Sequence, residues 1–232
     1  AISGGEITIS QSYEGIEGKT IDISGGDIEV VSSDDGLNAA GGNDQSGFGG
    51  NMGSDAFSAD SDIYIHISGG TININASGDG VDSNGNLTVS GGQTFVSGPT
   101  NNGNGAVDYN GEAVITGGIF IAAGSSGMAQ NFGSASTQGA IMVTVDSQPA
   151  GSTIALQDEN GTTLISWEAA KTFASVVVSC PEISVGKTYT LSAGSYEGEI
   201  AMSSLIYGTG GGMGGGMGGG GQNKGGGHVK QP

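Results

Sequence analysis

The stretch Ile21-Asp-Ile-Ser-Gly-Gly-Asp-Ile-Glu-Val30, with Ser33-Asp-Asp-Gly-Leu-Asn38 just after it, sets the pattern for the first half of the chain. Apolar and polar residues alternate on both sides of a Gly-Gly pair, which is the period of a β-strand with one buried face. Glycine adopts backbone conformations with positive φ at little cost, so we expect a corner at the Gly-Gly pair. An acidic turn follows the second alternating segment. The same pattern recurs between residues 1 and 130 and predicts a repeat architecture.

The Gly-Gly pairs define the length of the repeat. They lie at residues 4–5, 25–26, 69–70, 91–92 and 117–118, which gives spacings of 21, 44, 22 and 26 residues. Four-stranded propeller blades need about 40 residues per repeat, so these units are too short for a propeller. We therefore predict an all-β protein with a right-handed parallel β-helix over residues 1–138, a solenoid of about 22 residues per coil.

The remaining segments differ from this repeat. Residues 39–62 form a Gly-rich insertion, for which we expect a long loop over the coils or a degenerate extra coil. Residues 139–207 keep the alternation without Gly-Gly pairs, so we predict antiparallel strands that cap the end of the solenoid, with a hairpin turn at Asp158-Glu-Asn-Gly161. Residues 208–232 have the composition of a flexible Gly-rich linker. The chain starts inside a repeat, so we interpret it as an excised or processed fragment.

Charge and composition exclude several classes of function. The chain of 232 residues has a net charge of −18 and no arginine, so nucleic-acid binding is excluded and an acidic membrane surface would repel it. No apolar run reaches membrane-spanning length, so we expect no membrane insertion. Cys180 is the only cysteine, which rules out an intrachain disulfide and a cysteine-based zinc site. Divalent cations are the natural partners of so many carboxylates.

Stacking of the repeats would turn aligned positions into columns. One apolar column is predicted to point into the core: Ile16, Leu37, Val81, Val107 and Ala129. Two polar columns flank it, and from them and the adjacent Asp34 we take eight candidate metal ligands: Glu14, Glu17, Asp34, Asp35, Asn38, Asp79, Asp82 and Asp108.

These polar columns need a balancing charge. Two carboxylates one coil apart repel each other by roughly 1–3 kcal/mol. Ca²⁺ is the favoured cation because it takes six to eight oxygen ligands, whereas Mg²⁺ prefers to keep its water. Zinc is disfavoured because His66 stands alone on an alternating segment. The alternative is that these residues only cap turns, which Asp and Asn do in many proteins.

Several of these motifs together resemble a known family, the bacterial carbohydrate-binding proteins with bound calcium and a polysaccharide-lyase-like right-handed β-helix. The stretches that carry the resemblance fall within about residues 1–140: Tyr13-Glu-Gly-Ile-Glu-Gly18, Ser33-Asp-Asp-Gly-Leu-Asn-Ala39, Gly41-Gly-Asn-Asp44, Gly78-Asp-Gly-Val-Asp-Ser-Asn-Gly85, Ala106-Val-Asp-Tyr109 and Ser125-Ser-Gly-Met-Ala-Gln130. The resemblance implies a secreted or cell-surface module that binds plant-type polysaccharide, cellulose-like or uronate-containing, without cutting it. It supports calcium at the matching acidic turns.

Three hypotheses about function follow. The first is non-catalytic, calcium-dependent polysaccharide binding, with aromatic side chains as candidate contacts to sugar rings: Phe48, Phe57, Tyr64 and Tyr109. Each of these is as well explained by packing. The second is a polysaccharide lyase or hydrolase, which is disfavoured because a lyase needs a strong base and Lys19 is the only lysine before residue 171. The third is a purely structural surface or adhesin repeat. The oligomeric state stays open.

Overall fold

The described residues, 1–40 and 60–208 of the computed structural model, form β-strands and connecting segments without a helix. The predicted all-β class is therefore confirmed for this part of the chain. The bounds are β1 Ile2–Ser12, β2 Ile16–Glu17, β3 Thr20–Ser32, β4 Leu37–Ala39, β5 Tyr64–Ala76, β6 Val81–Ser83, β7 Asn86–Ser97, β8 Val107–Tyr109, β9 Ala113–Gly124, β10 Ala140–Gln148, β11 Thr153–Gln157, β12 Thr163–Glu168, β13 Phe173–Ser179, β14 Thr188–Ala193, β15 Tyr196–Ala201 and β16 Ile206–Tyr207.

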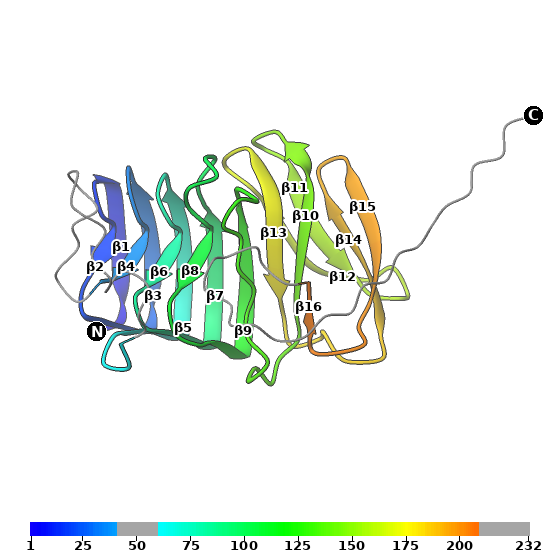
Figure 1. Ribbon diagram of the computed structural model, residues 1–232, viewed down its shortest axis with the longest axis horizontal. Helices are drawn as coiled ribbons and strands as arrows, with labels where there is room; N and C mark the ends of the chain where they lie inside the picture. Colours follow the sequence, from blue (N-terminus) through cyan, green and yellow to red (C-terminus); the bar gives the residue numbers. More distant parts are fainter. Residues whose placement is uncertain (41–59, 209–232) are drawn as a thin grey trace, which may run out of the picture.

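The strands pair into three sheets (Figure 1). An eight-stranded sheet has the order β1-β3-β5-β7-β9-β13-β10-β16, a four-stranded sheet of short strands has the order β2-β4-β6-β8, and a second four-stranded sheet has the order β12-β11-β14-β15. The first five strands of the large sheet run parallel, and so do the short strands. β13 then pairs antiparallel with both β9 and β10.

The predicted right-handed parallel β-helix is wrong. The large sheet is mixed, because antiparallel β13 and β10 continue the sheet that β1 to β9 begin. Within the described residues the sheets stay open and none closes on itself. Residues 139–207 do contain the predicted antiparallel strands, but β13 and β10 continue the large sheet beyond β9 instead of capping a solenoid (Figure 1).

The Gly-Gly pairs bend single long strands rather than separating two short ones. β3 runs through Gly25 and Gly26, and its register with β5 shifts between Ser24 and Asp27. The second glycine of the pair has φ +112°, a conformation that a side chain would strain. The expected positive φ is thus observed, but as an irregularity inside a strand of 13 residues.

Alternation along the strands builds the core. Ile23, Ile67, Val89 and Ile115 are lateral neighbours on β3, β5, β7 and β9, and all four are fully buried. On each strand, the two residues that flank this buried residue face outward, and on β3, β5 and β7 these flanking residues are polar. A row of branched apolar side chains packs well on a pleated surface, so this row stabilises the stacking of the repeats.

Two cores lie on opposite faces of the strands that the large sheet adds after β7. Val177 of β13 packs into the core of the repeats, whereas its neighbours Val176 and Val178 pack into a second core beneath the antiparallel four-stranded sheet. The predicted hairpin at Asp158–Gly161 joins β11 to β12, with Asp158 Oδ1 accepting from the Thr162 N–H at 2.8 Å. Because β13 is apolar on both faces, it is buried between the two cores.

The short parallel sheet confirms four of the five members of the apolar column expected from the sequence, since Ala129 lies beyond its last strand, β8. Ile16, Leu37, Val81 and Val107 are successive partners in its register, and all but the half-buried Ile16 are buried. Since β4 pairs directly with β6, and β3 with β5, no extra repeat lies between them. Most of the 39–62 insertion and of the 208–232 tail lies outside the described residues. No helix in the described segments has the length and apolarity to cross a membrane.

Candidate metal centre

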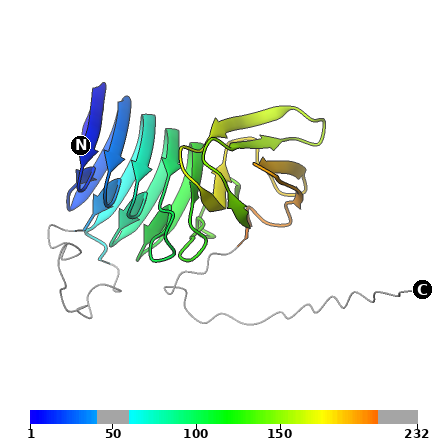
Figure 2. The same cartoon turned by 90° about the horizontal axis from the view of Figure 1, so that it is seen from above.

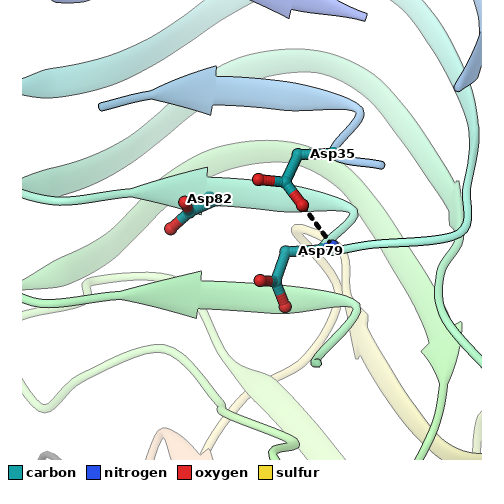
Figure 3. A group of neighbouring side chains, drawn as sticks. All are labelled: Asp35, Asp79 and Asp82. Atoms are coloured by element: carbon teal, nitrogen blue, oxygen red, sulfur yellow. Dashed lines mark hydrogen bonds between the residues drawn. The ribbon is translucent and has the colours of Figure 1, made fainter. Parts of the chain in front are cut away.

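Three aspartates from two successive repeats meet beside the short parallel sheet (Figure 3). Asp35 lies in the turn before β4, Asp79 in the equivalent turn before β6, and Asp82 on β6 itself. One carboxylate oxygen from each lies within 4.8 Å of the others. Two oxygens on opposite sides of a Ca²⁺ ion are about 4.6–5.2 Å apart, so one ion can contact all three carboxylates.

Asn38 supplies a fourth polar side chain to this group. It lies on β4 directly opposite Asp82 of β6, and only 1% of its surface is exposed. Its Nδ2 donates to Asp35 Oδ2 at 3.2 Å, which places the amide against the carboxylate group. Its Oδ1 is buried and accepts no hydrogen bond from the described residues. A buried carbonyl oxygen without a donor costs about 1–3 kcal/mol, and a cation would remove this cost.

The same carboxylates also hold successive turns together. Asp35 Oδ1 accepts from the Asp79 N–H at 2.6 Å (Figure 3). One repeat further on, Asp79 Oδ1 accepts from the Gly105 N–H. The capping role that the sequence left open is therefore present. The hydrogen bonds from the main chain use Oδ1 of Asp35 and Oδ1 of Asp79. The second carboxylate oxygen of Asp79, Oδ2, is a separate atom that can contact a cation. Capping and cation binding are compatible here.

The electrostatics of the site favour a positive ion. Burial, followed by the charges of Asp108, Asp34 and Glu14, raises the pKa of Asp79 from 3.8 to about 7, although the hydrogen bond from Gly105 lowers it. The described lysines make contacts elsewhere: Lys19 lies 3.8 Å from Asp62, Lys187 lies 2.7 Å from Glu159, and Lys171 donates to the Ala76 carbonyl. These observations show negative charge concentrated around Asp79.

The other predicted ligands surround the group without joining it. Glu17 is exposed on β2, beside Asn38 in the register. Asp34 lies next to Asp35, and a Cβ added at Gly78 would collide with both carboxylates. Glu14 is half-buried in the turn of the first repeat.

The carboxylate of Asp108 accepts hydrogen bonds from two neighbouring donors. Its Oδ1 accepts from Gln130 Nε2 at 2.6 Å and from the Tyr109 N–H at 2.9 Å. Burial raises the pKa of Asp108, and that hydrogen bond from Tyr109 lowers it. The predicted polar column of Glu17, Asn38, Asp82 and Asp108 is thus present as lateral partners in the short sheet. Only the middle of the polar columns, around Asp35, Asp79 and Asp82, forms a compact group of oxygens.

The predicted sugar-contact residues have different surroundings. Tyr109 packs against the core and its Oη donates to the Asn131 carbonyl at 2.6 Å, so its ring is held in place by packing. Tyr64 lines an open depression of about 340 Å³ on the outer face of β3, β5 and β7, together with Asp22, His66, Asn86 and Thr88. Phe48 and Phe57 lie outside the described residues.

A group in this depression escaped the sequence analysis. Asp22, His66 and Thr88 occupy equivalent positions on β3, β5 and β7 and are lateral neighbours. His66, treated above as isolated, has its Nδ1 3.7 Å from Asp22 Oδ1 and its Nε2 3.1 Å from Ser90 Oγ. The signal was present, because the same alignment on the Gly-Gly pairs that revealed the acidic columns also puts Asp22 beside His66.

Comparison of the chain with protein-family models, with curated proteins and with solved structures found no match.

Proposed function

We propose that the protein binds Ca²⁺ through Asp35, Asp79, Asp82 and Asn38, and that it is a secreted or cell-surface module that binds polysaccharide without cutting the glycosidic chain. The observation that carries the metal proposal is the buried Oδ1 of Asn38, which has no donor among the described residues and belongs to an amide whose Nδ2 donates to Asp35, one of three converging carboxylates. A cation provides the missing partner and offsets the repulsion between the carboxylates.

Calcium suits this donor set better than other ions. All four side chains offer oxygen, and Ca²⁺ completes a shell of six to eight ligands with main-chain carbonyls and water. Mg²⁺ requires a tighter octahedron, with oxygens about 4.2 Å apart across the ion, and keeps more of its water. No histidine or cysteine of the described residues belongs to the group, which disfavours zinc.

The polysaccharide part of the proposal has two supports. The acidic-turn motifs quoted above resemble those of calcium-containing carbohydrate-binding proteins. In addition, the outer face of the large sheet carries an open depression in which the Tyr64 ring lies among the polar side chains of Asp22, His66, Asn86 and Thr88. An aromatic ring beside hydrogen-bonding groups suits a sugar, whose faces are apolar and whose edges carry hydroxyls.

The metal proposal is tested by measuring bound ions and stability together. We expect elemental analysis of the purified protein to find calcium and chelation with EGTA to lower the melting temperature by several degrees. Asp82→Asn should weaken calcium binding by about 10- to 100-fold, by analogy with losses at other metal sites. The matched control is Asp27→Asn, because Asp27 is exposed on β3. Absence of calcium together with an unchanged melting curve would contradict the proposal.

The binding proposal is tested by retention on immobilised polysaccharides, cellulose-like and uronate-containing, with calcium and with EGTA. We expect retention that Tyr64→Ala weakens and that Tyr207→Ala, a change at an exposed tyrosine on β16, leaves unaltered. New reducing ends in the polysaccharide would show a lyase or hydrolase instead. Failure to bind any of the polysaccharides would favour a structural repeat.

A further inference from the structure

Three polar side chains on adjacent strands form a chain of contacts on the outer face of the large sheet. Asp22 lies on β3, His66 on β5 and Ser90 on β7, strands that lie side by side (Figures 1 and 2). Asp22 and His66 are lateral partners, and Ser90 lies two residues beyond Thr88, the partner of His66 on β7. Residues two apart on a strand share a face, so all three side chains point to the same side of the sheet.

The order of atoms in this chain is that of a nucleophile, a base and an orienting carboxylate. His66 Nε2 lies 3.1 Å from Ser90 Oγ, and Nδ1 lies 3.7 Å from Asp22 Oδ1. Asp22 Oδ2 accepts from Tyr64 Oη at 3.1 Å, which leaves Oδ1 directed toward the imidazole. A carboxylate beside Nδ1 favours the tautomer that carries its proton there, so that the lone pair of Nε2 faces the serine hydroxyl.

Equivalent serines in the other repeats show that the contact of Ser90 is particular to it. Ser24 and Ser68 also precede a Gly-Gly pair, but their hydroxyls point to main-chain carbonyls, Oγ of Ser24 to Ile2 at 3.5 Å and Oγ of Ser68 to Ile23 at 3.4 Å. Ser90 Oγ is directed to an imidazole instead. It is exposed, and the two residues after it are glycines, which add no side chain over the hydroxyl.

Ser90 lies beside the depression that Tyr64 and His66 line, since it contacts His66. We propose that Ser90, with His66 as general base and Asp22 as the residue that orients His66, hydrolyses acyl esters on sugar hydroxyls of a polysaccharide bound in that depression. The activity goes beyond the proposed binding function and rests on that function only for the polysaccharide nature of the substrate. It removes acyl groups and leaves glycosidic bonds intact, so it is consistent with binding without chain cleavage.

The reaction has two balanced steps. Ser90 Oγ attacks the ester carbonyl carbon while its proton passes to His66 Nε2, and the sugar alkoxide then leaves as the free hydroxyl with that proton, forming an acyl-serine. A water molecule next attacks the acyl carbon and gives a proton to Nε2. The carboxylic acid leaves, and the proton on Nε2 returns to Ser90 Oγ. Water is the only co-reactant and no oxidation occurs.

The inference is tested with a small ester, so that its outcome does not depend on polysaccharide binding. We expect the full chain to hydrolyse 4-nitrophenyl acetate, and a fluorophosphonate probe to label Ser90, located by peptide mass spectrometry. Ser90→Ala and His66→Gln should each lower kcat by about 100-fold or more, the range of general-base catalysis. Ser68→Ala, at the equivalent position of the preceding repeat, should keep the parent rate and the parent labelling.

The role of Asp22 has its own readout. Asp22→Asn should lower kcat about tenfold with KM unchanged, and Asp22→Glu should restore part of the rate, since a carboxylate again faces Nδ1. Unaltered melting curves would show that each variant is folded. Labelling at another residue, or a Ser90→Ala variant that keeps the parent rate, would overturn the proposal, as would a parent protein no faster than buffer.

The same variants separate this inference from the proposed function. Acetylated xylan should release acetate with the parent protein and not with Ser90→Ala, while Ser90→Ala should still bind the polysaccharide. Ester hydrolysis without retention on any polysaccharide would support the esterase activity and contradict the proposed binding function. Retention on a polysaccharide without ester hydrolysis or labelling of Ser90 would support the binding function and contradict the esterase activity.

Discussion

The substitution Asp79→Asn measures how much the metal-free protein is destabilised by its concentrated negative charge. Burial, and then the charges of Asp108, Asp34 and Glu14, raise the pKa of Asp79 from 3.8 to about 7 despite the lowering effect of the Gly105 hydrogen bond. Because the folded pKa lies above the unfolded value, the folded protein holds more protons than the unfolded chain between about pH 4 and pH 7. The free energy of unfolding therefore falls as the pH rises through this window.

The magnitude follows from the two pKa values. At 1.36 kcal/mol per pKa unit, a pKa raised from 3.8 to about 7 corresponds to about 4 kcal/mol. The Asp79 side chain is partly accessible to water, so we expect a loss of about 2–4 kcal/mol between pH 4 and pH 8 in metal-free protein. An asparagine keeps an oxygen that can accept from the Gly105 N–H and has no charge to lose, so most of this pH dependence should vanish.

Urea denaturation in EGTA at pH 4.5, 6 and 8 measures the effect in the parent protein and in Asp79→Asn, with Asp27→Asn as the control for a lost exposed charge. Because calcium binds the ionised carboxylate, calcium affinity of the parent should fall about tenfold per pH unit below pH 7. Calorimetry in buffers of different ionisation enthalpy should detect the released proton. Equal pH dependence of stability in the parent and in Asp79→Asn would refute the reasoning, as would a calcium affinity that does not change between pH 5 and pH 7.

Three further predictions concern packing and charge. Leu37→Ala should lower the free energy of unfolding by about 2–5 kcal/mol in urea titrations, because Leu37 is fully buried in the central column of the short parallel sheet. Gly78→Ala should weaken calcium binding measured by titration calorimetry, since a Cβ there collides with the carboxylate of Asp35, whereas Gly4→Ala adds a Cβ in open space and should leave binding unchanged. Burial lowers the pKa of Lys171 from 10.5 to about 8, so the unfolded chain binds more protons between these values and stability should rise from pH 8 to pH 10.5. The variant Lys171→Met should not show that rise in thermal unfolding, and a rise that persists in this variant would contradict the assignment.

The sequence by itself determined the strands and their stacking. Alternation with period 2 reports which side chains face inward, and the Gly-Gly pairs count the repeats, so the alignment placed Leu37 beside Val81 and Asn38 beside Asp82, as the register shows. This works because parallel strands from similar repeats pair position by position, and a shift by one residue would turn every apolar side chain outward.

The same alignment also predicts the polar row on the outer face of the large sheet, Asp22, His66 and Thr88. Asp22 and His66 occupy one position of the repeat and are lateral neighbours on β3 and β5, although each is a single polar residue in its own repeat. The chemistry of a lone histidine suggested little, whereas a histidine between a carboxylate and a serine suggests an acyl-transfer site.

Only the tertiary structure decided how the sheets are joined and which oxygens converge. Sequence repeats state that neighbouring strands pair, but whether the sheet curls closed or continues into other strands depends on partners remote in the chain, and here β13 extends it antiparallel at β9. Likewise, seven polar residues fit the predicted columns and Asp34 is adjacent to them, yet three carboxylates and one amide form the compact group, because side-chain directions in the turns are set by packing and by hydrogen bonds between repeats. The repeat thus fixed which positions are neighbours, and the folded chain fixed the distances on which binding and chemistry depend.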